Sequence, residues 1–118
     1  MRQGLGWAAA TGVAAVVLVS GCRSLKPAVP VEQLTAQQGE GYQVFQTRCA
    51  VCHYERVSRP KNGPALRGVF QHDYLPSGAP ANDERVAATV LHGHGMMPAQ
   101  PDIDPESLDA LLAYLHTV

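Results

Sequence analysis

Two cysteines and a histidine stand close together in the middle of the sequence, in the stretch Cys49-Ala50-Val51-Cys52-His53. Thiols at this spacing lie about one helical turn apart, so each can add across one vinyl group of a porphyrin and form a thioether. The imidazole directly after the second thiol then lies beneath the ring, where one of its nitrogens can ligate iron. This C-x-x-C-H pattern is typical of covalent haem c attachment. It predicts one haem c per chain, attached through Cys49 and Cys52, with His53 as the proximal iron ligand.

The same two cysteines have other uses in proteins. A C-x-x-C pair can form a redox-active disulfide or supply half of a zinc site. A redox pair of the thioredoxin type needs a strand followed by a helix, which this sequence does not indicate. A zinc site needs two further ligands, and His92 and His94 would have to supply them at no familiar spacing. The haem is therefore the favoured interpretation, and a colourless protein would favour a thiol or zinc module instead.

The third cysteine, Cys22, follows an apolar segment at the N-terminus. Arg2 is the only charged residue in positions 1–21, and residues 4–19 are almost all apolar or small. A basic start, an apolar stretch and small residues before a cut are the three parts of a secretory signal. The apolar stretch is also shorter than the roughly 20 residues that a membrane-spanning helix needs. These features predict a signal peptide over residues 1–21.

The stretch Val19-Ser20-Gly21-Cys22 resembles the bacterial lipobox. In lipoproteins with this motif, the cysteine receives a diacylglycerol and becomes the new N-terminus after cleavage. The resemblance implies lipid attachment at Cys22 and places the mature chain on the periplasmic face of a bacterial membrane, inner or outer. Residues 22–34 contain Pro27 and Pro30 and show no periodicity, which predicts a semi-extended linker. Its twelve residues after the cysteine, at about 3.1 Å each, reach no more than roughly 37 Å.

Three helices are expected in the remaining chain, residues 35–118. Their start signals are Thr35 with Gln38 at capping-box spacing, Asn82 before two acidic residues, and Asp104 before Pro105. The apolar positions at helical spacing are Tyr42, Phe45 and Cys49, then Val86, Val90 and Leu91, then Leu108, Leu111, Leu112 and Leu115. Gly93 is placed to end the second helix. The Pro- and Gly-rich stretch over residues 54–81 has little period of its own, which favours a loop wrapped around a bound group.

Residues 39–118 resemble a small monohaem cytochrome c of class I. Gly41-x-x-x-Phe45-x-x-x-Cys49 is similar to the first helix of that family, whose glycine and aromatic residue cross the last helix closely. Leu111 to Leu115 is similar to that last helix, and Tyr114 is then expected near the glycine. The resemblance implies an all-α cytochrome c fold, with three main helices and long loops around a covalently attached haem c.

Two further segments carry this resemblance and imply site residues. Asn62 to Val69 is similar to the family's G-P-x-L-x-G-V segment, in which the proline carbonyl accepts a hydrogen bond from the proximal histidine. That role falls to Pro64, and such a bond orients the ring and raises its basicity. Gly95 to Ala99 is similar to the family's distal loop, in which a methionine before proline ligates the iron. That role falls to Met97.

The distal ligand has alternatives nearby. Met96 could take the place of Met97, or could pack against the haem edge as methionines often do. His92 and His94 would give bis-histidine iron at a lower reduction potential, although residues at a helix end also serve as caps.

Charge and ligation together indicate the function. Nine basic and ten acidic residues give a formal net charge of −1, which gives no support to nucleic-acid binding. The basic residues around the cysteine motif are Arg48, Arg56, Arg59, Lys61 and Arg67. They form either an ordinary solvated surface or, as the alternative hypothesis, a surface that steers acidic partners toward the haem edge. Six-coordinate iron leaves no position for a substrate, so we expect an electron carrier rather than an enzyme, serving periplasmic or membrane redox proteins. The alternatives are a haem-based sensor of small ligands and an electron-entry subunit of a larger oxidoreductase.

Overall fold

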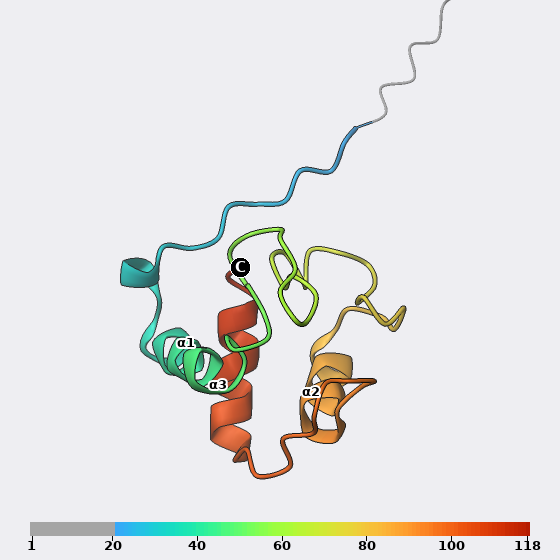
Figure 1. The fold of residues 1–118 in the computed structure, drawn as a ribbon. Helices are drawn as coiled ribbons and strands as arrows, with labels where there is room; N and C mark the ends of the chain where they lie inside the picture. The colour runs from blue at the N-terminus through green and yellow to red at the C-terminus, as the bar shows by residue number, and fades with distance from the viewer. Residues whose placement is uncertain (1–20) are drawn as a thin grey trace, which may run out of the picture.

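The computed structural model describes residues 21–118, and the predicted signal peptide lies, apart from Gly21, outside them (Figure 1). The chain forms a short 3₁₀ helix, η1 (Val31–Gln33), and three α-helices: α1 (Ala36–Arg48), α2 (Asp83–His92) and α3 (Pro105–Leu115). Within the described residues β-structure is limited to two isolated bridges, Tyr74 with Pro80 and His94 with Met97. The predicted all-α fold with three main helices and long loops is confirmed. In this part of the chain, no helix is both long enough and apolar enough to cross a membrane.

Local capping starts each α-helix at the residue that the sequence predicts. At each N-cap, the side-chain oxygen accepts a hydrogen bond from the backbone N–H three residues later. Thr35 accepts from Gln38 at 3.2 Å, Asn82 from Arg85 at 2.9 Å, and Asp104 from Ser107 at 2.8 Å. Gln38 also accepts a bond from the Thr35 backbone, which completes the capping box. Gly93 ends α2 with a positive φ of 75°, a conformation that favours glycine. Hydrogen bonds from the first turn of α3 hold the pKa of the Asp104 carboxyl below its usual value.

The end of α1 differs slightly from the predicted pattern. The apolar spacing runs through Cys49, but the helix ends at Arg48 and Cys49 is its C-cap. The Cys49 carbonyl then accepts hydrogen bonds from the backbone N–H groups of Cys52 and His53, both at 3.0 Å. The C-x-x-C-H residues therefore occupy a hydrogen-bonded turn just after the helix, which brings both thiols and the imidazole to one side of it.

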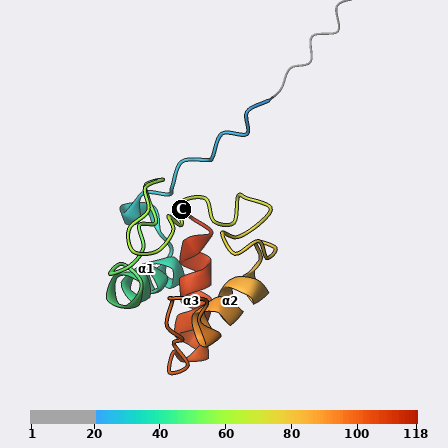
Figure 2. The ribbon, with the colours of Figure 1, turned by 45° about the vertical axis from the view of Figure 1, so that its right-hand side comes forward.

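The helices α1 and α3 cross at close range, as Figures 1 and 2 show. A Cβ atom at Gly41 would lie 1.9 Å from the Ala110 carbonyl oxygen and 2.8 Å from the Tyr114 Cβ, so only glycine fits at this crossing. Tyr114 and Phe45 are both fully buried beside it, with ring centroids 5.9 Å apart. The expected contact between the glycine of the first helix and Tyr114 of the last is confirmed.

Gly41→Ala is expected to lower the free energy of unfolding of the holoprotein by at least about 3 kcal/mol, because the new methyl group meets backbone atoms of α3 that cannot move independently. Gly39→Ala is the matched control in the same helix, since nothing lies within 4 Å of a Cβ there. That change should be stabilising by about 0.5–1 kcal/mol, the usual gain of Ala over Gly in a helix. Denaturant unfolding followed by far-UV circular dichroism measures both values. Equal effects at the two positions would contradict the close crossing.

The expected linker is more ordered than its sequence suggests. Residues 25–34, here called the strap, lie along the domain, and Ala28 and Leu34 pack against its core. The Val29 N–H donates to the Thr117 carbonyl at 2.8 Å. Of the predicted semi-extended linker, residues 25, 28, 29 and 34 are partly buried, and only residues 22–24 precede the first of these contacts. Thr117, which accepts the bond from Val29, is 88 residues further along the chain, and no local sequence pattern predicts so distant a contact.

Candidate functional site

A cavity of about 590 Å³ lies between the three α-helices and the long loop. This volume is within the range of pockets that hold cofactors. Its walls are mostly apolar, and the side chains that supply them are Phe45 of α1, Val86 and Val90 of α2, Leu111 and Leu115 of α3, and Leu66, Val69 and Leu75 of the loop. The core of the domain is therefore arranged around a hollow rather than filled by side chains alone.

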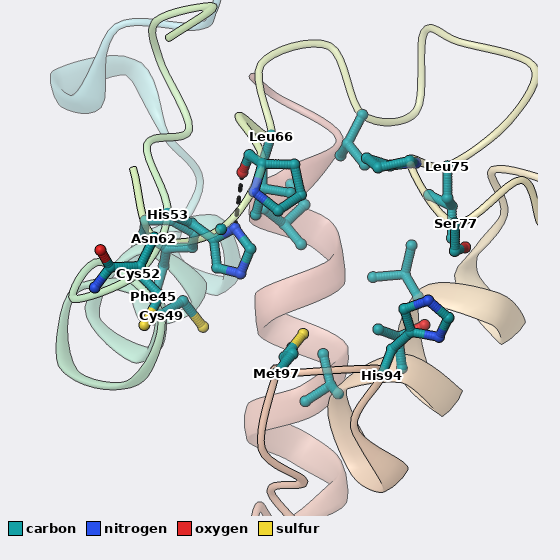
Figure 3. Close-up of a pocket in the computed structure, with 18 of the residues that line it drawn as sticks. Phe45, Cys49, Cys52, His53, Asn62, Leu66, Leu75, Ser77, His94 and Met97 are labelled. Carbon is teal, nitrogen blue, oxygen red and sulfur yellow. Dashed lines mark hydrogen bonds between the residues drawn. The ribbon is translucent and has the colours of Figure 1, made fainter. Parts of the chain in front are cut away.

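The cavity collects nearly all of the site residues that the sequence predicts. Cys49, Cys52, His53, Pro64 and Met97 all line it. Figure 3 shows the two thiols beside His53 on one wall, with the imidazole of His53 and the sulfur of Met97 facing the same space from different loops. Cys22 lies elsewhere, exposed at the start of the described chain.

His53 is held in one orientation. The residue is only 8% exposed, and Nδ1 of its ring lies 2.8 Å from the Pro64 carbonyl oxygen (Figure 3). A carbonyl only accepts, so Nδ1 carries the proton and Nε2 keeps its lone pair. Gly63 makes room for this ring, because a Cβ there would lie 2.5 Å from the His53 Cε1. The structure thus contains the carbonyl contact expected at Pro64 and presents a nitrogen able to ligate a metal.

The two motif cysteines are free and half-buried. Burial raises the pKa of the Cys49 thiol to about 11, although the neighbouring Arg48 opposes the effect. At neutral pH this group is a thiol rather than a thiolate. A redox-active cysteine pair depends on a lowered thiol pKa, so the environment of Cys49 does not suit the dithiol alternative. Among residues 21–118, no three His, Cys, Asp or Glu side chains gather in a cluster able to hold a metal ion.

The loop after α2 distinguishes the two candidate methionines. His94 and Met97 form a tight backbone turn, with the Met97 N–H donating to the His94 carbonyl at 2.9 Å and the reverse bond at 3.1 Å. Met97 is partly buried against the core, whereas Met96 at the cavity mouth is fully exposed, at 102%. His94 also lines the cavity, while His92 does not. The geometry therefore favours Met97 over Met96 as the distal ligand. His94, in the same loop, is the alternative of another ligand type.

Two basic residues from the predicted steering surface are used inside the domain instead. Arg48 donates to Gln100 and Asp102, with all three contacts at 3.2 Å, and so ties the end of α1 to the segment after Met97. Arg56 points inward to the Tyr114 hydroxyl at 3.3 Å and to the Val29 carbonyl at 3.0 Å. The surface expected from five basic residues is therefore smaller than the sequence suggests.

A buried polar network beside the site was not predicted. Glu55 is only 8% exposed, and one of its carboxylate oxygens accepts from the Tyr114 hydroxyl at 3.0 Å and from Gln46 at 3.1 Å. Burial raises the pKa of Tyr114 well above its usual value, so the hydroxyl stays protonated and can donate. The network joins α1, the segment after His53 and α3. Its members are 9 and 59 residues apart, so no sequence motif could have revealed it.

The chemistry of these groups fits a haem. The cavity offers an apolar surface, two thiols for attachment, an oriented imidazole nitrogen and a thioether sulfur. Imidazole and thioether are the axial ligand pair of electron-carrying c-type haems. A helical domain built around such a site is of the cytochrome c class.

Comparison with known proteins gives the same result. The chain belongs to the family described as "Cytochrome C oxidase, cbb3-type, subunit III", which matches residues 36–115. It is also similar to the "Cytochrome c oxidase subunit 2" of Alkalihalophilus pseudofirmus, with 32% identity over 95 residues. That match covers 75% of this chain but 27% of the relative, so the chain spans about a quarter of its length. The protein is therefore a monohaem cytochrome c domain, and its family implies haem c and electron transfer.

Proposed function

We propose that this protein is a lipid-anchored electron carrier of the bacterial periplasm. In this proposal Cys49 and Cys52 attach one haem c, His53 and Met97 ligate its iron, and the Pro64 carbonyl orients His53. Cys22 carries the lipid that keeps the domain at the membrane. When bound, the haem supplies a one-electron iron couple, and the protein supplies ligation, burial and orientation.

The proposal depends mainly on one observation: the side chains of His53 and Met97 face the same apolar cavity from different loops. The bond to Pro64 leaves Nε2 of His53 free to ligate. With an imidazole and a thioether both bound, no coordination position remains for a substrate, so the domain would exchange only electrons. A methionine ligand also gives a higher reduction potential than a second histidine would.

An absorption spectrum of the purified protein, oxidised and reduced, tests this assignment. We expect the sharp visible bands of a low-spin haem c in the reduced protein and the weak far-red band of methionine ligation in the oxidised one. Carbon monoxide should not bind. Ready binding of carbon monoxide would favour the sensor alternative, and a colourless protein would overturn the haem assignment.

The lipid anchor rests on the sequence around Cys22 and on the exposure of this residue. Its side chain is free and exposed, and the two residues after it are exposed as well, so an acyl-transferring enzyme has access. Stable attachment needs more than one acyl chain, which a diacylglycerol provides. Mass spectrometry of the mature protein from its membrane fraction tests this, since the lipid adds a defined mass at residue 22.

A second candidate is an electron-entry subunit of a membrane oxidoreductase. It is favoured by the description of the family and by the relative, both of which are named as cytochrome c oxidase subunits. A permanent subunit should stay bound to larger membrane proteins through mild detergent extraction and size-exclusion chromatography. A free carrier should elute as a small, separate particle.

The remaining basic surface indicates the charge of the partner. Arg59 and Lys61 are exposed and flank the Tyr54 ring, at 4.9 and 5.2 Å from its centroid. Lys61 also donates to the Ala50 carbonyl, between the two attachment cysteines, at 2.8 Å. We propose that acidic or anionic partners approach here, where complementary charge speeds association.

Oxidation of the reduced protein by hexacyanoferrate(III) should therefore slow as salt concentration rises, because screening weakens the attraction between unlike charges. Arg59→Gln should lower the rate at low salt and flatten its salt dependence. Arg85→Gln removes the same charge from α2 and serves as the control. Stopped-flow measurement of the oxidation rate at several salt concentrations compares the two variants. Equal salt dependence in both would show that the net charge of the protein, and not the position of Arg59, sets the rate.

A further inference from the structure

We propose that the strap, residues 25–34, fixes the orientation of the domain on the membrane, with one defined face against the lipid headgroups. This face, here called the anchor face, consists of Leu25, Lys26, Gln71 and Tyr74. The inference rests on the proposed lipid at Cys22. It goes beyond that proposal because an anchor alone would let the domain tumble at the end of its linker.

The start of the strap is docked on the loop that follows the site. The Lys26 N–H donates to the Gln71 side-chain oxygen at 2.6 Å. Gln71 in turn donates to the Val118 carbonyl at 3.2 Å, so one side chain bridges the strap and the C-terminus. Leu25 lies over Gly68, where a Cβ would come within 2.8 Å of its side chain. These contacts fix the position at which the strap leaves the domain.

The middle of the strap is bound to the core. Val29 donates to the Thr117 carbonyl at 2.8 Å, and the Val29 carbonyl accepts from Arg56 at 3.0 Å. Arg56 is itself held by the Tyr114 hydroxyl at 3.3 Å. Thr117 and Val118 are buried beneath these contacts, and Figures 1 and 2 show the strap passing close to the C-terminus. The strap is thus a bound part of the domain rather than a tether.

Docking shortens the free connection to the lipid. From Cys22 to Leu25 the chain has three steps, which span at most about 11 Å even when fully extended. A free linker over residues 23–34 would reach about three times as far, roughly 37 Å. Arg23 also lies 3.8 Å from Asp73 in the exposed segment. The domain surface around Leu25 must therefore stay within about 11 Å of the lipidated cysteine.

The anchor face suits contact with a membrane surface. Tyr74 is 66% exposed, and its ring with a polar hydroxyl matches the boundary between acyl chains and water. Lys26 is an exposed cation of the same face, suited to anionic headgroups. Asp73 is the neighbouring acid, and it is paired with Arg23. The bilayer is the expected occupant because the covalent lipid holds it within reach.

This orientation has a consequence for the site. Leu75 and Ser77, which follow the anchor face in the chain, form one wall of the cavity, and the two cysteines lie on the opposite side in Figure 3. The Met97 loop, between α2 and α3, lies at the end of the domain away from the strap in Figures 1 and 2. The cysteine side and the Met97 loop would therefore face the periplasm, accessible to water-soluble partners.

Hydroxyl-radical footprinting of the lipidated holoprotein tests the proposal, with Tyr74 and Met96 as two reactive reporters in one molecule. Both side chains are exposed in the free domain, at 66% and 102%. On vesicles of phosphatidylethanolamine with phosphatidylglycerol, oxidation of Tyr74 relative to Met96 should fall by about threefold or more compared with a non-lipidated, soluble form. An unchanged ratio in lipidated protein would overturn this inference alone, whereas an unmodified Cys22 would overturn the anchor and the orientation together.

Two insertions distinguish a docked strap from a free linker. About ten Gly and Ser residues, with an average span of roughly 17 Å, are placed either between Ser24 and Leu25 or between Leu34 and Thr35. The first lengthens the free connection and should restore Tyr74 oxidation, while the second lies behind the docked strap and should leave Tyr74 protected. If both insertions restore oxidation equally, the strap does not hold and the proposal is wrong.

Discussion

Replacing Cys49 and Cys52 together by Ala is expected to abolish covalent haem attachment. The exported double variant should show no haem stain on a denaturing gel, where the wild-type protein stains strongly. Each thiol lines the cavity beside His53, and no other cysteine lies near enough to replace them, since Cys22 is exposed on the N-terminal segment. Without thioether bonds the haem would be held only by its axial ligands, which denaturation removes.

The same variant should also lose its fold. On a scale of about 24 cal/mol per Å³, leaving a cavity of about 590 Å³ unfilled would cost up to roughly 14 kcal/mol. That upper bound is as large as the entire stability of a typical domain, about 5–15 kcal/mol. Far-UV circular dichroism should therefore show a largely unfolded chain, and the cell should contain little of it, because unfolded exported proteins are degraded.

Cys22→Ala is the matched control, since it removes a thiol outside the cavity. It should keep the haem stain and lose the lipid mass, while the double variant should keep the lipid and lose the stain. The three cysteines would then divide into one anchor and one attachment pair. A double variant that still carries haem through a denaturing gel would contradict the assignment of Cys49 and Cys52.

The helices could be predicted from the sequence because their start signals are local. Thr35, Asn82 and Asp104 each cap a helix through a bond to a residue three positions away, and the structure contains all three bonds. The attachment motif is equally local, since its five residues are contiguous. Such features depend on short-range geometry, which a single sequence records directly.

Long-range contacts could not be predicted in this way. The strap is held by acceptors near residues 71 and 117, and the Glu55 network joins residues from three separate segments. Their sequence neighbourhoods have no periodicity that would bring them together. The basic cluster shows the same limit, because Arg48 and Arg56 look like surface charges until their partners Asp102 and Tyr114 are seen.

The distal ligand could be predicted from the sequence only in part. A methionine before proline favoured Met97 by resemblance, but adjacent residues cannot be separated by spacing alone. In the structure Met97 packs against the core and Met96 is fully exposed. The backbone bonds between His94 and Met97 close a turn that places residue 96 at its tip, so the loop geometry favours the same residue as the resemblance.

Met97→Ala is accordingly expected to remove the far-red band of the oxidised protein completely. The reduction potential should fall by an amount on the order of 0.1 V or more, since axial ligands set haem potentials over a wide range. His94 lines the same cavity and is the replacement ligand that we expect. Combining Met97→Ala with His94→Ala should therefore leave an open position, at which the reduced protein binds carbon monoxide.

Met96→Ala is the control that makes this test specific, because it removes the same side chain one residue away. Its side chain is exposed, so the variant should keep the far-red band and shift the potential only slightly. Absorption spectra and redox titration of the two single variants provide the comparison. If the band disappears in the Met96 variant and survives in the Met97 variant, then the loop must turn the other sulfur inward when haem is bound, and Met96 is the ligand.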